Sequence, residues 1–291
     1  MAALRHLLRK AMVAMNQVFN GILHTSHFPE TWERVLLDME KAFDKVWHNG
    51  LLHKLLDTPM PSALTRVITS FLHQCNFCVD VKEPHYVSFL ETADVNVIVL
   101  DWRGIANSGY WTAVRGVPNV GEHLGDFLTW LVNLTGSNWN NIHLIGFSLG
   151  AHVVGNAGRR TGSRPTRITG LDPAGPEWGG NANALKSNDG AYVECIHTCG
   201  GRLGINDPIC AANFYPNGGR HRQPGCGLLS YTCSHSRAYE YFAASVRFDH
   251  LVGRQCTNQS QANNNNCSGA AFNMGNSILY KRVSVLNYHH S

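Results

Sequence analysis

One segment constrains the fold of this chain more than any other. The apolar run "NIHLIGF" (141–147) predicts a buried strand, and "LGAHVVGNAGRR" begins a helix immediately after it. A strand that passes directly into a helix needs a tight turn, and the pattern Gly146-Phe-Ser-Leu-Gly150 places a small residue on each side of that turn. Such a turn lifts the Ser148 hydroxyl clear of the sheet and places the backbone N–H of Leu149 at the helix N-terminus. Ser148 is therefore a candidate nucleophile, and Leu149 a candidate donor to an oxyanion.

Strands and helices alternate from about residue 94 onward. The runs "DVNVIVLDW", "TRITGL" and "AYVECIHT" predict further buried strands, the first of them covered on both faces. A helix is predicted where Val120, Leu124, Phe127 and Leu131 recur at helical spacing. Repeated β-α-β units imply an α/β fold with a parallel sheet and helices on both faces.

Composition and charge exclude several classes of protein. A hydrophobic fraction of 44% is enough for a packed core, and a formal net charge of +4 gives no reason to expect a nucleic-acid partner. The apolar runs are far shorter than the roughly 20 residues needed to span a bilayer. The N-terminus, interrupted by Arg5, Arg9 and Lys10, predicts an amphipathic helix and not a secretory signal.

The cysteines point to an oxidising compartment. Seven of the nine lie after residue 190, and such clustering favours disulfides. Metal ligation is the alternative, but no two of these seven have C-x-x-C spacing. We therefore expect no metal and no cofactor.

A serine nucleophile needs a base and an orienting acid. In the order Ser-Asp-His, typical of this fold class, Asp101 comes too early, and Asp172 in "TRITGLDPAGP" is the first suitable acid. It follows a predicted strand, where sites gather in parallel sheets, although a turn-forming Asp-Pro would also explain it. The predicted base is His235, on a loop anchored by Cys233 at the start of an amphipathic helix, and His197 at a strand end is the second candidate.

Seven phrases carry a resemblance to a known family: "NVIVLDW", "NIHLIGFSLGAHVVGNAGRR", "RITGLDPAGP", "YVECIHT", "NFYPNGG", "QPGC" and "CSHSRAYEYFAAS". In this order they resemble the animal pancreatic-type lipases, especially insect neutral lipases and phospholipase A1-like members, over about residues 87–280. The resemblance implies an α/β-hydrolase domain at 87–291 with Ser148 as nucleophile, Asp172 as acid and His235 as base. It also implies an extracellular esterase that acts on lipid at a membrane or lipid surface. A non-catalytic, yolk-protein-like lipid binder is the alternative, and the complete Ser-Asp-His set argues against it.

The same resemblance implies a lid closed by a disulfide. The lid would comprise only residues 227–232, which can cover little apolar surface, so phospholipids or short-chain esters are favoured over bulk triacylglycerol. Spacing and resemblance together suggest three pairs and leave Cys195 as a buried thiol. The expected pairs are Cys226–Cys233, Cys199–Cys210 and Cys256–Cys267.

Residues 1–86 carry a different resemblance. The stretch "LLDMEKAFDKVWHNGLLHKL" resembles the reverse transcriptase of non-LTR retrotransposons, with Asp38 at the position of a metal-binding aspartate. Two-metal phosphoryl transfer needs further carboxylates, which this family supplies as an Asp-Asp dipeptide, and the chain contains none. We therefore expect a mostly helical, non-functional segment at 1–86, joined in a chimera to the lipase-like domain.

One element of the lipase pattern is missing. The resemblance implies a His-Gly phrase on an earlier strand, which provides a second oxyanion N–H, and no such phrase occurs between residue 87 and Ser148. The expected domain is therefore an N-terminally truncated α/β-hydrolase. Loss of one oxyanion donor lowers turnover by about 10²–10³.

Overall fold

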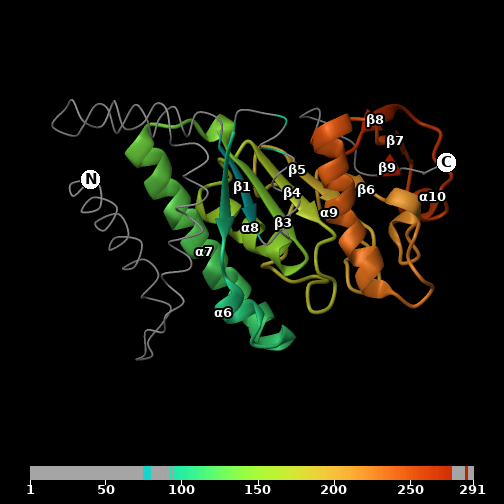
Figure 1. Cartoon of the computed structure of the whole chain (residues 1–291), viewed down its shortest axis with the longest axis horizontal. Helices are drawn as coiled ribbons and strands as arrows, with labels where there is room; N and C mark the ends of the chain where they lie inside the picture. Colours follow the sequence, from blue (N-terminus) through green and yellow to red (C-terminus); the bar gives the residue numbers. More distant parts are fainter. Residues whose placement is uncertain (1–74, 80–88, 90–91, 93–94, 277–285, 288–291) are drawn as a thin grey trace. The chain divides into compact units, whose positions relative to one another are not determined.

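The computed structural model describes residues 75–79, 89, 92, 95–276 and 286–287 (Figure 1). The predicted reverse-transcriptase-like phrases and Asp38 lie outside the described residues. The chain divides into two compact units, and the larger, residues 72–132 and 137–291, contains the sheet and the candidate site.

The described residues form a nine-stranded sheet in the order β2-β1-β3-β4-β5-β6-β9-β7-β8. Pairing is parallel from β2 to β9, whereas β7 pairs antiparallel with β9 and β8. The strands are β1 Cys75–Val79, β2 Asn96–Leu100, β3 His143–Phe147, β4 Arg167–Leu171, β5 Val193–Ile196, β6 Ala212–Phe214, β7 Val252–Gln255, β8 Ala271–Asn273 and β9 Leu286–Asn287.

Five α-helices and two short 3₁₀ turns are described around this sheet. They are α6 Arg103–Ala106, α7 Tyr110–Thr135, η1 Trp139–Asn141, α8 Leu149–Arg160, η2 Pro216–Gly219, α9 Tyr231–Phe248 and α10 Gln259–Asn263. None of the described helices is long and apolar enough to cross a bilayer. The parallel sheet with its helices confirms the predicted α/β-hydrolase fold.

Each face of the central strands packs against a different layer of helices, because successive side chains along a strand point to opposite faces. On one face, Ile145 and Leu171 share a core with Ala238 and Phe242 of α9. On the other face, Ile168 lies against Gly158 of α8. Figure 1 shows α9 on one side of the sheet and α7 on the other.

Glycines allow α7 to pack closely against α8. A Cβ added at Gly121 would overlap the Asn156 side chain, and one at Gly125 would lie 2.5 Å from Cβ of Arg160. The buried apolar residues of α7, including Val120, Leu124 and Leu131, confirm the predicted helical spacing.

The sheet extends further toward the N-terminus than the predicted boundary at residue 87. Residues Cys75–Val79 fall in the segment expected to be foreign, yet they pair with both β2 and β3, and Val79 lies opposite Leu100 and Gly146. The position beside β3 is therefore filled by β1. This apolar run, "CNFCV", is too short for periodicity to distinguish it from a helix segment, which is why the sequence did not reveal it.

The prediction that "DVNVIVLDW" is buried on both faces was wrong. Most residues of β2 are only half-buried, and Val99 is 49% exposed. The cause is position, because β2 is the outermost strand of the described sheet and has one neighbour, β1.

Candidate active site

Ser148 occupies the turn between β3 and α8 in a strained conformation, with φ 55° and ψ −120°. Non-glycine residues rarely adopt positive φ, and such strain persists only where the surroundings enforce it. Here the Ser148 N–H donates to the Leu171 carbonyl (3.0 Å), and the Ser148 carbonyl accepts from the Ala174 N–H (3.1 Å). A Cβ at Gly146 would overlap the Gly150 carbonyl, so the first glycine of the pattern is required by space.

Leu149 is the first residue of α8. The first N–H groups of a helix have no carbonyl partner within it and carry the positive end of the helix dipole. The Leu149 N–H is therefore available to a developing negative charge beside Ser148, and its role as an oxyanion donor stays a prediction.

Asp172 immediately follows β4, and its side chain is fully buried. Its Oδ1 accepts hydrogen bonds from the backbone N–H groups of Thr198 (2.7 Å) and Cys199 (3.1 Å), and its Oδ2 lies 2.6 Å from His235 Nδ1. Three N–H donors thus compensate the burial of this carboxylate. An aspartate needed only for an Asp-Pro turn would not make these contacts with remote segments.

His235 lies in the second turn of α9, which begins at Tyr231, and not on the loop that was predicted. Because the helix begins at Tyr231, the disulfide at Cys233 lies in its first turn. The His235 ring packs on Phe147, with centroids 4.5 Å apart, and is 7% exposed. A carboxylate can only accept, so Nδ1 carries the proton and Nε2 keeps a lone pair for a base.

The three predicted residues lie together at the carboxyl ends of β3 and β4. Asp172 and His235 are in direct contact, and Ser148 bonds through its backbone to Leu171 and Ala174, which flank the Asp172-Pro173 pair. His235 also packs on Phe147, the residue before Ser148. Between the described side chains of Ser148 and His235 no hydrogen bond is formed, and in ligand-free sites such contacts often tighten only with substrate.

The second candidate base, His197, and the excluded acid, Asp101, make other contacts. His197 is buried, and its Nδ1 and Nε2 lie 3.0 Å from the Ile205 carbonyl oxygen and 3.1 Å from Asn213 Oδ1, so each ring nitrogen faces an acceptor. Burial lowers the pKa of His197, against the opposing effects of the Asn213 bond and the Asp172 charge. Both ring nitrogens are thus already engaged. Asp101 is exposed and pairs with Arg103 at 2.6 Å.

Gly204 supports Asp172 in a way that the sequence did not reveal. A Cβ at this position would overlap Asp172 Oδ1, so only glycine allows the loop after β5 to close over the carboxylate. The Gly204 N–H bonds to the Cys199 carbonyl (3.1 Å), which fixes the strand end that supplies the two backbone donors. The residue is one of 28 glycines, and no local pattern marks it.

His152 is a second supporting residue that sequence reasoning missed. It lies one helical turn after Ser148 and stacks on Trp178 at 3.9 Å. Its Nε2 donates to the Ala174 carbonyl (2.9 Å), and its Nδ1 accepts from the Leu185 N–H (3.0 Å). Burial is the main cause that lowers the pKa of His152 to about 4. A neutral imidazole therefore fixes the segment that also bonds to the Ser148 carbonyl.

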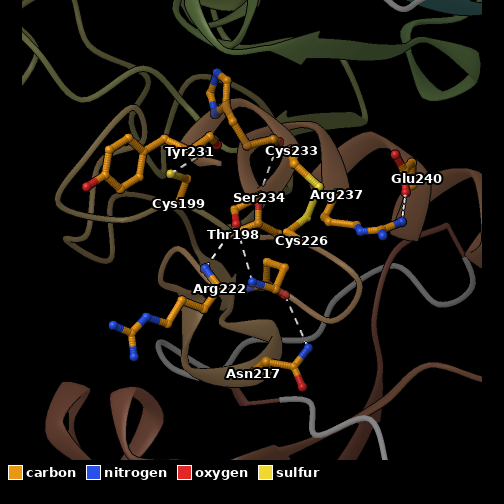
Figure 2. Close-up of a disulfide and its surroundings, with 12 residues drawn as sticks. Thr198, Cys199, Asn217, Arg222, Cys226, Tyr231, Cys233, Ser234, Arg237 and Glu240 are labelled. Carbon is orange, nitrogen blue, oxygen red and sulfur yellow. Dashed lines mark hydrogen bonds and ion pairs between the residues drawn. A yellow bond between two sulfur atoms is a disulfide. The ribbon is translucent and has the colours of Figure 1, made fainter. Parts of the chain in front are cut away.

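Three disulfides are formed among the described cysteines. Two have the predicted pairing, Cys226–Cys233 (Figure 2) and Cys256–Cys267. The third joins Cys195 to Cys210, and Cys199 is a free, buried thiol.

The predicted pairing of Cys199 with Cys210, with Cys195 as the thiol, was therefore wrong. Cys195 lies on β5 and Cys210 just before the adjacent strand β6, so their Cα atoms are 5.7 Å apart, within disulfide range. Cys199 lies beyond the end of β5, and its thiol contacts the Tyr231 carbonyl at 3.5 Å. Strand pairing, which the spacing of cysteines along the chain does not reveal, decides the partner.

Within the described part of the chain, no cluster of three or more His, Cys, Asp or Glu side chains has metal-binding geometry.

Several known proteins are similar to this chain in sequence. The family model described as Lipase matches residues 80–285. Hepatic triacylglycerol lipase of Rattus norvegicus is 35% identical over 217 residues, covering 65% of this chain and 44% of the relative. Phospholipase A1 member A of Bos taurus is 39% identical over 180 residues (59% and 39%), and pancreatic triacylglycerol lipase of Homo sapiens is 33% identical over 218 (65% and 47%). The chain thus spans less than half the length of these relatives.

Proposed function

The chain belongs to the lipase family, and from this premise we propose that it is a serine carboxylic-ester hydrolase that acts on lipid esters. The observation that carries the proposal is the 2.6 Å contact between the buried Asp172 carboxylate and His235 Nδ1, beside the strained turn of Ser148. A lipid-binding protein without catalysis has no use for a buried carboxylate aimed at an imidazole.

In the proposed reaction, His235 Nε2 takes the proton of the Ser148 hydroxyl as its oxygen attacks the ester carbonyl. The carbonyl oxygen becomes an oxyanion, which the Leu149 N–H stabilises, while Asp172 stabilises the imidazolium. His235 then gives its proton to the departing alcohol, leaving an acyl ester on Ser148. Water, deprotonated by His235, hydrolyses that ester and regenerates the serine.

The oxyanion hole sets the expected rate. Leu149 supplies one donor, and the sequence lacks the His-Gly phrase that provides the second in the family. The segment that follows β1 lies outside the described residues. We therefore propose turnover about 10²–10³ below that of a two-donor hole.

The substrate is proposed from the lid loop, residues 227–232, which Cys226 and Cys233 close and whose last two residues begin α9. A loop of this size hides little apolar surface, so the site does not depend strongly on an oil interface to open. This favours phospholipids, as in a phospholipase A1, or short-chain esters over bulk triacylglycerol. The three disulfides favour an oxidising, extracellular location.

Hydrolysis of p-nitrophenyl butyrate by the full chain tests the proposal. The Ser148→Ala variant should lose activity to background, because no nucleophile remains. Ser163→Ala is a matched control, since Ser163 also has positive φ (59°) but follows the far end of α8. Equal hydrolysis by the parent chain and Ser148→Ala would leave the lipid-binding alternative as the better account.

A further inference from the structure

Three exposed arginines gather beside the lid loop. Arg202 lies on the loop after β5, and Arg220 and Arg222 lie on the loop after η2. Tyr231 connects the two loops, because its ring lies 5.3 Å from the Arg202 guanidinium carbon and 5.2 Å from the His221 ring. Partial burial is the largest cause that lowers the pKa of His221. The charges of Arg202, Arg222 and Arg220 lower it further, so all three arginines lie near this ring.

These arginines are not neutralised by the protein. Within the described ranges, none of the three guanidinium groups forms an ion pair with a carboxylate. Asp207, on the same loop as Arg202, does not pair with them. Figure 2 shows the contrast, since Arg237 turns toward Glu240 and pairs with it while Arg222 extends away from the disulfide. An unpaired cationic cluster attracts anions from solution.

The loop that carries two of these arginines is held rigidly. The N–H groups of Arg222 and Gln223 both donate to Ser234 Oγ of α9, at 3.0 and 3.3 Å. The Gln223 amide donates to the carbonyls of Pro216 (2.8 Å) and Arg220 (2.9 Å). The backbone that carries Arg220 and Arg222 is therefore held in place close to the start of α9.

Exposed apolar side chains closely precede Tyr231, whose ring lies beside Arg202. Leu228 and Leu229, at the tip of the lid loop, are 68% and 82% exposed, and the Tyr231 N–H bonds to the Leu229 carbonyl at 3.1 Å. Neighbouring exposed leucines are costly in water and mark an interaction surface. Cations beside apolar side chains match a bilayer with anionic headgroups, which offers negative charge above hydrocarbon.

We propose that Arg202, Arg220 and Arg222, together with Leu228 and Leu229, form a docking surface for bilayers rich in anionic phospholipid. The surface adjoins the candidate site, because Tyr231 lies one helical turn before His235 and the loop of Arg202 begins at the backbone donors to Asp172. Docking itself does not depend on hydrolysis. Its consequence, preferred cleavage of anionic phospholipid, rests on the proposed function.

Vesicle flotation of the full chain carrying Ser148→Ala measures docking without turnover. We compare phosphatidylcholine vesicles with vesicles that also contain phosphatidylglycerol. Each arginine near an anionic surface strengthens binding about fivefold, so replacing Arg220 and Arg222 by Gln should weaken binding to anionic vesicles about 25-fold. The matched control replaces Arg115 and Arg254 by Gln, two exposed arginines without a carboxylate partner among the described residues, and should leave binding unchanged.

Two further measurements complete the test. Replacing Leu228 and Leu229 by Ser should weaken binding to both kinds of vesicle, because the apolar contact is lost. Hydrolysis of soluble p-nitrophenyl butyrate by the Arg220→Gln/Arg222→Gln chain with Ser148 intact should equal that of the parent. This measurement distinguishes a loss of docking from a loss of catalysis. Equal binding to neutral and anionic vesicles would overturn the proposal. So would unaltered vesicle binding by the arginine variant, or arginine-dependent binding to heparin with no preference among vesicles.

Discussion

Replacing Asp172 by Asn removes one charge and leaves the size of the side chain unchanged. The structure determines how the new amide would sit. Its oxygen must take the place of Oδ1, where the N–H groups of Thr198 and Cys199 converge at 2.7 and 3.1 Å. Its NH₂ group then faces His235 Nδ1 at the position of Oδ2. Two donors cannot share one hydrogen bond, so the imidazole must present a lone pair at Nδ1 and carry its proton on Nε2.

The magnitude follows from this tautomer. A proton on Nε2 leaves no base for the Ser148 hydroxyl. Reversing the amide would oppose the two backbone N–H groups, at a cost of about 1–3 kcal/mol for each unsatisfied donor, so the wrong tautomer dominates. The same exchange in a Ser-His-Asp triad lowers kcat about 10⁴-fold, which corresponds to about 5 kcal/mol. Because both backbone bonds survive, the thermal midpoint should change little.

Steady-state hydrolysis of p-nitrophenyl butyrate measures the effect, and thermal unfolding reports on the fold. Asp126→Asn is the control, since it makes the same chemical change in an exposed ion pair with Arg160, which is worth little. A folded Asp172→Asn chain with kcat within about tenfold of the parent would refute the role assigned to this carboxylate.

Three further outcomes are expected. Gly204→Ala forces a methyl group against the buried carboxylate and should lower kcat about 100-fold in the same assay, whereas unaltered turnover would contradict the close packing. His152 has a pKa lowered to about 4, so the unfolded chain binds more protons between about pH 6.5 and pH 4, and up to about 3 kcal/mol of stability should be lost across that range. Denaturant titrations of His152→Gln should show a smaller loss, and an identical pH profile would count against this assignment. Mass spectrometry of an unreduced digest should link Cys195 to Cys210, and a link from Cys210 to Cys199 would contradict the structure.

The parts of the fold that local sequence determines were predictable. The turn at Ser148 is predicted from a strand, a helix and two glycines within ten residues. The helix α8 has the predicted bounds, Leu149–Arg160. Asp172 was selected as the candidate acid because functional loops follow the carboxyl ends of parallel strands. These features need no knowledge of which strands become neighbours.

The remaining features depend on tertiary neighbours. The backbone donors at Thr198 and Cys199 reach Asp172 only because β5 lies beside β4, and the pairing of Cys195 depends on β6 lying beside β5. The spacing of residues along the chain does not show which strands lie side by side in the sheet. The five residues of β1 were missed for a related reason, because pairing on both sides, and not periodicity, makes this short run a strand.

Covalent labelling tests the central claim most directly. A fluorophosphonate ester incubated with the full chain should lose fluoride and form a phosphonyl ester on Ser148, which mass spectrometry locates in the peptide that contains it. The adduct should be absent from Ser148→Ala and form far more slowly with Asp172→Asn. A chain that hydrolyses p-nitrophenyl butyrate but carries its label elsewhere, or no label at all, would contradict the assignment of Ser148, Asp172 and His235 as one catalytic unit.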